Sequence, residues 1–130
     1  MSSPRPGLAA EQSHVVGEAD TAAVVGSGDV PVLATPRLLA WLEAASVAAL
    51  DGVLADGATS VGTRIDLEHL APSAVGVTVT VRAEITAVDG RLVQFTVVAL
   101  HKDGKIAAHG RITRVVVDRA RFLARSTGSP

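Results

Sequence analysis

The sequence contains no cysteine and no tyrosine, and its aromatic residues are one Trp and two Phe. Without cysteine, the 130-residue chain can form neither a disulfide framework nor a thiolate metal site. So few aromatic rings leave little surface on which bases could stack, and a formal net charge of −1 gives no electrostatic footprint for nucleic acid. We therefore expect no nucleic-acid partner.

A long apolar run is also missing. The longest, at residues 38–50, is interrupted by Glu43 and Ser46 and is too short to cross a bilayer. The first twelve residues lack the apolar segment of a signal peptide. These absences predict a cytoplasmic protein with no membrane partner, and the length is enough for one domain with its own core.

What the chain does contain is one clear helix pattern. Thr35 can serve as the N-cap and Pro36 as the first helical residue. Apolar residues then recur at helical spacing, namely Leu38, Leu42, Ala45 and Ala49. Gly52 is the expected stop. Before this helix, residues 14–25 form a weak strand pattern.

Four more strands are predicted after the helix, the first at residues 59–68. Residues 75–85 alternate between apolar and polar side chains, as expected for a strand with one buried face. Asp89-Gly90 and Asp103-Gly104 are strong hairpin signals. The last three strands should therefore form an antiparallel meander.

One helix laid on about five antiparallel strands is an α+β layer architecture. We expect the domain to cover residues 13–118, between a flexible segment at 1–12 and a basic, then small and polar, tail at 119–130. A single helix cannot cover so much sheet, and open sheet edges favour association. The sequence therefore predicts a homodimer, with a dimer of dimers as a further option.

Two segments resemble the fluoroacetyl-CoA thioesterase-like family of hotdog-fold thioesterases. They are ATPRLLAWLEAAS (34–46) and SVGTRIDLEHLAPSAVGVTVTVRAEI (60–85). The second is the more specific, because a histidine loop, a proline and a Val-Gly pair precede an alternating strand in the order of that family. The resemblance spans roughly residues 14–118. It implies a hotdog fold, with one long helix on a curved antiparallel sheet, and hydrolysis of an acyl-CoA thioester without a cofactor.

The same resemblance assigns catalysis to Thr35, Glu43 and His69, and places the strand glycine of the family at Gly62, where we expect substrate contact. Taken alone, each catalytic candidate has an ordinary structural explanation. Thr35 can be a helix cap, Glu43 a solvated helix residue, and His69 a loop histidine. An imidazole titrates near neutral pH, however, which suits general acid–base work. A threonine hydroxyl can attack a thioester, or orient water or the carbonyl.

Glu43 is unusual because its helix offers almost no polar face around it. Its i+4 neighbour is Val47 rather than a cation, so the carboxylate should be costly unless it has a partner or a task. Thr35 and Glu43 are separated by roughly 12 Å of helix rise. Both therefore cannot reach one acyl carbon directly from one straight helix. A site shared across a dimer, as in hotdog thioesterases, would solve this problem.

Five arginines gather near the C-terminus, at Arg111, Arg114, Arg119, Arg121 and Arg125. They can be a solvated strand face and tail, or they can bind CoA phosphates, which suit guanidinium groups. Arg111 and Arg114 are the preferred candidates for substrate binding. The other histidines show no metal-ligand spacing, so no metal site is predicted.

The acyl group is left open by the sequence. Fluoroacetyl selectivity in the family is associated with a phenylalanine-rich pocket and lid, whereas the first 94 residues here contain no Phe. We expect a small or short acyl group. Two alternatives are a non-catalytic acyl- or ligand-binding hotdog module and, with less support, an acyl-CoA hydratase, whose usual Asp and His pair is missing from this chain.

Overall fold

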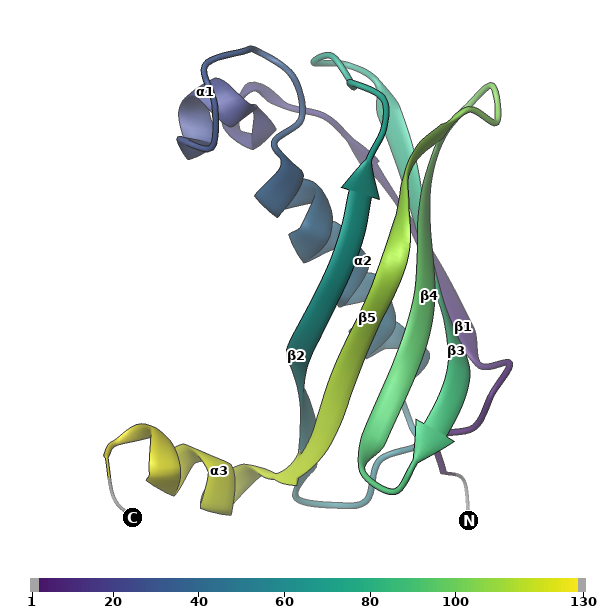
Figure 1. The fold of residues 1–130 in the computed structure, drawn as a ribbon, viewed down its shortest axis with the longest axis vertical. Coiled ribbons are helices and arrows are strands. Elements are labelled where there is room, and N and C mark those ends of the chain that lie inside the picture. Colours follow the sequence, from purple (N-terminus) through teal and green to yellow (C-terminus); the bar gives the residue numbers. More distant parts are fainter. Residues whose placement is uncertain (1–2, 129–130) are drawn as a thin grey trace.

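The computed structural model describes residues 3–128, and its largest feature is a five-stranded antiparallel sheet. The strand order is β1-β3-β4-β5-β2, and the long helix α2 (Thr35–Ala49) lies across one face of the sheet (Figure 1). The strands are β1 (Ala9–Val15), β2 (Ala58–His69), β3 (Thr78–Asp89), β4 (Leu92–His101) and β5 (Ile106–Asp118). The predicted α+β architecture is confirmed.

Three short elements complete the chain. The turn η1 (Glu18–Asp20) and the helix α1 (Ala22–Val25) connect β1 to α2, and the helix α3 (Arg119–Ser126) follows β5. Figure 1 shows α3 leading away from the sheet beyond β2. None of the helices within residues 3–128 is both long and apolar enough to cross a membrane.

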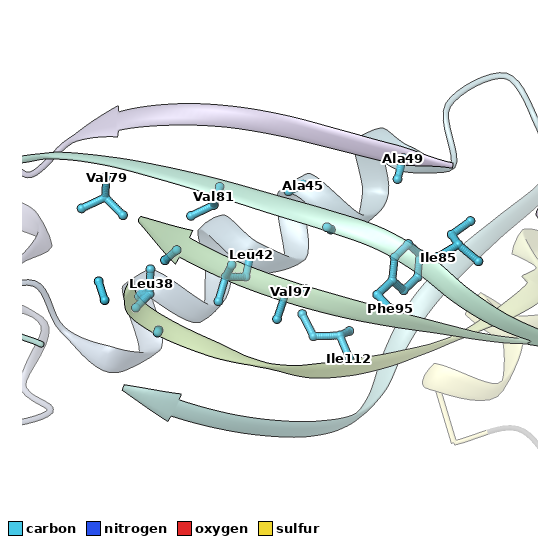
Figure 2. Packing of buried hydrophobic residues seen from close by; sticks show 14 of the residues in the cluster. Leu38, Leu42, Ala45, Ala49, Val79, Val81, Ile85, Phe95, Val97 and Ile112 are labelled. Atoms are coloured by element: carbon cyan, nitrogen blue, oxygen red, sulfur yellow. The ribbon is translucent and has the colours of Figure 1, made fainter. Parts of the chain in front are cut away.

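The core lies between α2 and the sheet. All four predicted helix positions are buried, and the valines at 79 and 81 and Ile85 of β3 are fully buried opposite them, as Figure 2 shows together with Phe95 of β4. Because side chains alternate along a strand, the polar residues between these positions face away from the helix. The expected alternation of the third strand is confirmed from Val79 to Ile85.

The hairpin predictions are also correct. Asp89-Gly90 joins β3 to β4, and Asp103-Gly104 lies in the turn that joins β4 to β5. The strand that precedes this meander in sequence, β2, returns to pair with β5 at the sheet edge.

The position of the first strand was wrongly predicted. It runs through residues 9–15, pairing from Ala9 with Glu84 to Val15 with Thr78, so part of the segment expected to be flexible is in the sheet. These residues show no strand pattern of their own and form a strand because they pair with the edge of β3, since strand preference depends on context. The predicted strand residues Val24 and Val25 lie instead in α1.

The C-terminal tail also differs from the prediction. Residues 119–126 form α3 rather than a loose segment. Asp118 caps this helix, because its carboxylate accepts a hydrogen bond of 2.9 Å from the backbone N–H of Arg121. None of the residues of α3 is buried.

Candidate active site

The hydroxyl of Thr35 contacts the imidazole of His69. The Thr35 Oγ1 to His69 Nδ1 distance is 2.7 Å, across 34 residues of sequence. Thr35 is the first residue of α2 rather than its N-cap; Ala34 takes the N-cap position and provides no side-chain bond. The interpretation of Thr35 as a helix cap is therefore wrong, and its hydroxyl is directed to the histidine.

His69 ends β2, and its side chain is half-buried. Its Nε2 atom is buried and has no hydrogen-bond partner in the part of the chain that the structure describes. Burial lowers the pKa of His69, and the backbone of Ala71 opposes this effect. A lowered pKa keeps the imidazole neutral near pH 7, which is the form that can accept a proton.

A pocket of about 320 Å³ opens beside this pair. Besides Thr35 and His69, its lining is mostly small and aliphatic, including Ala22, Val30, Val32, Leu33, Leu70 and Pro72. These residues come from α1, from the segment that leads into α2, and from the loop after β2. The pocket offers an apolar surface next to one polar pair, which suits a small acyl group.

The loop after β2 follows the path that its proline and glycine suggested. Gly76 has a φ of +92°, in the left-handed region that glycine adopts at no steric cost. Its N–H donates to the carbonyl of Val16, 2.8 Å away, which holds the loop against the end of β1. Pro72 is exposed and lines the pocket.

Glu43 lies two helical turns beyond Thr35, and it has a partner that the sequence did not reveal. Its Oε2 is 3.2 Å from Nη1 of Arg114 on β5. Arg114 is only 6 % exposed, and its guanidinium also donates to the hydroxyl of Ser60 at 2.8 Å and to the Ser60 carbonyl at 3.1 Å. Burial lowers the pKa of Arg114, while the charge of Glu43 opposes this.

Gly62 makes room for the Glu43 carboxylate. It lies on β2 at a bulge in the pairing with β5, and a Cβ atom at this position would overlap Oε2 of Glu43. Gly62 therefore leaves the space that the Glu43 carboxylate needs to reach Arg114. The expected substrate contact of Gly62 is not tested by these observations and stays a prediction.

Arg111 and Arg114, the preferred candidates for substrate binding, lie on opposite faces of β5. Their binding to CoA is not tested by these observations and stays a prediction. Arg114 is turned inward with Glu43 and Ser60. Arg111 is exposed on the outer face, in a hollow with Asp66, Thr96 and His109. Since successive side chains alternate across a strand, two residues three positions apart point to opposite faces. The sequence alone could therefore have assigned Arg111 and Arg114 to different faces of β5.

Comparison with known proteins identifies the family. The profile described as "FlK: Fluoroacetyl-CoA-specific thioesterase" matches residues 16–120. A fluoroacetyl-CoA thioesterase of Streptantibioticus cattleyicolor is 35 % identical over 94 residues, which cover 72 % of this chain and 67 % of the relative. The chain belongs to this family of thioesterases.

Solved structures of thioesterases agree with this assignment. The fluoroacetyl-CoA thioesterase FlK superposes with a TM-score of 0.89 at 29 % identity, and the match covers 99 % of each chain. A hot-dog-like protein from Thermanaerovibrio acidaminovorans gives 0.86 at 27 % identity, covering 95 % of this chain and 90 % of the other. The hotdog fold expected from the resemblance is thus confirmed for this member of the thioesterase family.

Proposed function

We propose that this thioesterase hydrolyses a small acyl-CoA thioester, with Thr35 and His69 as its central catalytic pair. The observation that carries the proposal is the 2.7 Å contact between Thr35 Oγ1 and His69 Nδ1, at the edge of an apolar pocket. Thr35 is exposed whereas Nε2 of His69 is buried. The atom that meets the substrate is therefore the threonine hydroxyl.

In the proposed first step, Thr35 Oγ attacks the thioester carbonyl carbon and its proton passes to Nδ1 of His69. Collapse of the tetrahedral intermediate breaks the C–S bond, and the CoA sulfur leaves with that proton. Water then attacks the Thr35 ester, again with His69 as the base, and releases the free acid. If Thr35 instead orients a water molecule or the carbonyl, His69 keeps the role of base but no acyl-enzyme forms.

The start of α2 supports the charge that develops in this reaction. Ala34 at the N-cap position provides no side-chain oxygen to the first turn. The positive end of the helix dipole therefore lies at Thr35, next to the place where the carbonyl oxygen becomes negative.

Glu43 and Gly62 enter the proposal through a second copy of the chain. Within residues 3–128 the edge strand β2 is unpaired on one side, and α2 lies mainly over β3 and β1. Ile65, which shares a face of β2 with Leu67, a partly buried residue packed against the core, is 39 % exposed. Antiparallel pairing of β2 with its own copy would cover this face and form a homodimer. Such a dimer is the arrangement in which Glu43 and Gly62 can join a shared site.

The same pairing would bring the α3 end of one copy beside the end of the other copy's β2 that carries His69. Three arginines lie on α3, at positions 119, 121 and 125, and none forms an ion pair within residues 3–128. We therefore assign the CoA phosphates to α3 in preference to Arg111 and Arg114. A cytoplasmic location, where acyl-CoA is made and used, completes the proposal.

Release of free thiol from a panel of acyl-CoAs tests this function. Because the chain has no cysteine, a thiol reagent reports CoA release with no protein background. We expect release from acetyl-CoA and propionyl-CoA and less from long-chain substrates, which the pocket cannot hold. A protein that binds acyl-CoA without releasing thiol would be a binding module instead. Mass spectrometry of the enzyme during turnover would detect an acyl group on Thr35 if the threonine is the nucleophile.

A further inference from the structure

A second contact between a hydroxyl and a histidine lies outside the proposed catalytic pair. The hydroxyl of Ser73 is 2.6 Å from Nε2 of His101, the last residue of β4. Ser73 is fully buried, so its hydroxyl cannot reach substrate or bulk water. A buried hydroxyl is costly unless it is hydrogen-bonded, and alanine would fill nearly the same volume. The pair therefore needs an explanation other than packing.

Ser73 lies at a junction between the two segments that carry the proposed catalytic side chains. Its carbonyl accepts a hydrogen bond of 2.8 Å from the N–H of Leu33, two residues before Thr35. In the other direction it lies four residues after His69, in the same loop. The neighbouring residues Val32 and Ala74 form a β-bridge that strengthens the junction.

The start of the loop is also held by backbone hydrogen bonds to β5. The N–H groups of Leu70 and Ala71 both donate to the carbonyl of Ala107 on β5, at 2.8 and 3.1 Å. These backbone bonds fix the start of the loop, next to His69. Its far end is held by the bond from Gly76 to Val16, and between the two ends the side chain of Ser73 is hydrogen-bonded to His101 at the end of β4.

We propose that Ser73 and His101 are positioning residues that set the distance between the Thr35 hydroxyl and the His69 ring. This inference rests on the proposed function of the Thr35–His69 pair. His101 ends a central strand of the sheet and so provides a rigid anchor. Ser73, in the His69 loop, is bonded to this anchor through its side chain. Its carbonyl is bonded to Leu33, in the segment before α2, so both segments are fixed relative to the sheet. Displacements of about 1 Å at reacting groups can lower a rate by as much as 100-fold.

Ser73→Ala and His101→Leu test the inference in the full-length enzyme. Both remove the side-chain tie and leave the backbone bonds of the loop in place. We expect kcat to fall about tenfold for each, with KM changed by less than about twofold, because neither residue touches the substrate pocket. His101→Gln can still bond to Ser73 through its side-chain amide and should recover much of kcat. The NMR signal of His69 Nδ1, which reports its contact with Thr35, should shift in the first two variants and return in the third.

His14→Leu is the matched control. His14 is a half-buried histidine that stacks on Trp41 at a ring distance of 4.3 Å, on the β1 side of α2. Its replacement should change thermal stability and leave kcat and the His69 signal as they are. All rates are taken per folded molecule. If Ser73→Ala does not fold, the comparison of His101→Leu with His101→Gln still decides the question.

Two results would overturn the inference, and they differ in what else they overturn. If Ser73→Ala and His101→Leu keep the wild-type kcat while His69→Ala loses activity, the pair is only structural and the proposed function stands. If His69→Ala itself keeps wild-type turnover, the proposed catalytic pair is wrong, and there is nothing for Ser73 and His101 to position.

Discussion

The polar pairs Thr35–His69 and Glu43–Arg114 both include a residue of α2, and they differ in how many of their polar atoms are already hydrogen-bonded. Thr35 and His69 form a contact of two neutral groups in which the hydroxyl is exposed and Nε2 of the imidazole has no hydrogen-bond partner among residues 3–128. Glu43 and Arg114 form a charged pair in which the guanidinium is buried and bonded on several sides. The first pair has unused bonding capacity at the edge of a pocket. The second is largely satisfied inside the fold.

This difference indicates that the Thr35–His69 pair serves turnover and that the Glu43–Arg114 pair serves mainly the stability of the fold. Unused donors and acceptors beside an apolar pocket can be given to a substrate. A buried guanidinium, in contrast, contributes to folding only as long as its carboxylate is in place. Substitutions at the first pair should therefore change turnover more than stability, and substitutions at the second should change stability first.

The largest expected effect is on turnover at the first pair. His69→Ala removes the base and should lower kcat by about 100-fold or more, the scale expected for lost acid–base catalysis. Thermal stability should change little, because the ring has one hydrogen bond and lies at the end of a strand. The measurement is thiol release together with a melting curve. Wild-type turnover in this variant would show that His69 is only a loop residue.

The next effect is on stability at the second pair. Glu43→Ala leaves the buried guanidinium of Arg114 without its counter-ion and should destabilise the fold by about 2 kcal/mol. This lies below the usual range for a broken buried pair, because the Glu43 side chain is 35 % exposed. The sequence led us to expect that an unpaired Glu43 carboxylate destabilises the fold. The structure reverses this, because Glu43 is paired and its removal is what should destabilise the fold. Urea denaturation provides the measurement.

The exposed pair Arg82–Glu84 is a natural control for this prediction. Its N to O distance of 3.0 Å is shorter than that of Glu43–Arg114, yet its side chains are 45 % and 44 % exposed. Glu84→Ala should therefore cost less than about 0.5 kcal/mol. Equal losses in the two variants would contradict the view that burial of Arg114 determines the effect.

A smaller effect is expected at Gly62, which separates the strand from the carboxylate. Gly62→Ala adds a Cβ that overlaps Glu43, so the carboxylate must move away from Arg114. We expect a loss of about 1 kcal/mol. The same substitution made in Glu43→Ala should cost much less, because the group that it displaces is gone. Additive losses in this double-mutant cycle would show that Gly62 acts independently of Glu43.

Much of the sheet could be predicted because its signals are local. Alternation assigns each residue of β3 to a face, and Asp-Gly pairs fix the two turns of the meander. The first strand could not be predicted in the same way. Its residues Ala9–Val15 do not alternate in hydrophobicity, and they are in the sheet because the long edge of β3 is available to them.

The site was predictable in part, and only through resemblance. No rule of spacing joins Thr35 to His69, which are far apart in sequence and meet through the loop after β2. The partner of Glu43 is equally remote, since Arg114 lies on the last strand. One signal was present and overlooked: Arg114 lies two residues after the apolar Ile112, on the same face of β5, and therefore faces the core.

The smallest expected effect, a shift in pH dependence, bears most directly on the separation of the two pairs. Burial lowers the pKa of His69, so the acid limb of kcat/KM should have its midpoint below the ordinary histidine pKa of about 6.5. The contribution of His69 to the free energy of unfolding has the matching pH dependence. It is present above the unfolded-state pKa and is lost as the pH falls through the lower folded-state value.

Rate profiles between about pH 4.5 and 8.5, roughly two units either side of that ordinary pKa, are the measurement. His69→Ala should lose the acid limb, and the exposed-pair variant Glu84→Ala should retain it unchanged. A midpoint above the ordinary value would contradict the prediction, because it requires a negative charge beside the imidazole. The nearest such charge along α2 is Glu43, two turns away and paired with Arg114 within one chain. If Glu43→Gln then returned the midpoint to a lower pH, the carboxylate would have to come from a second copy. The two pairs would in that case form one site.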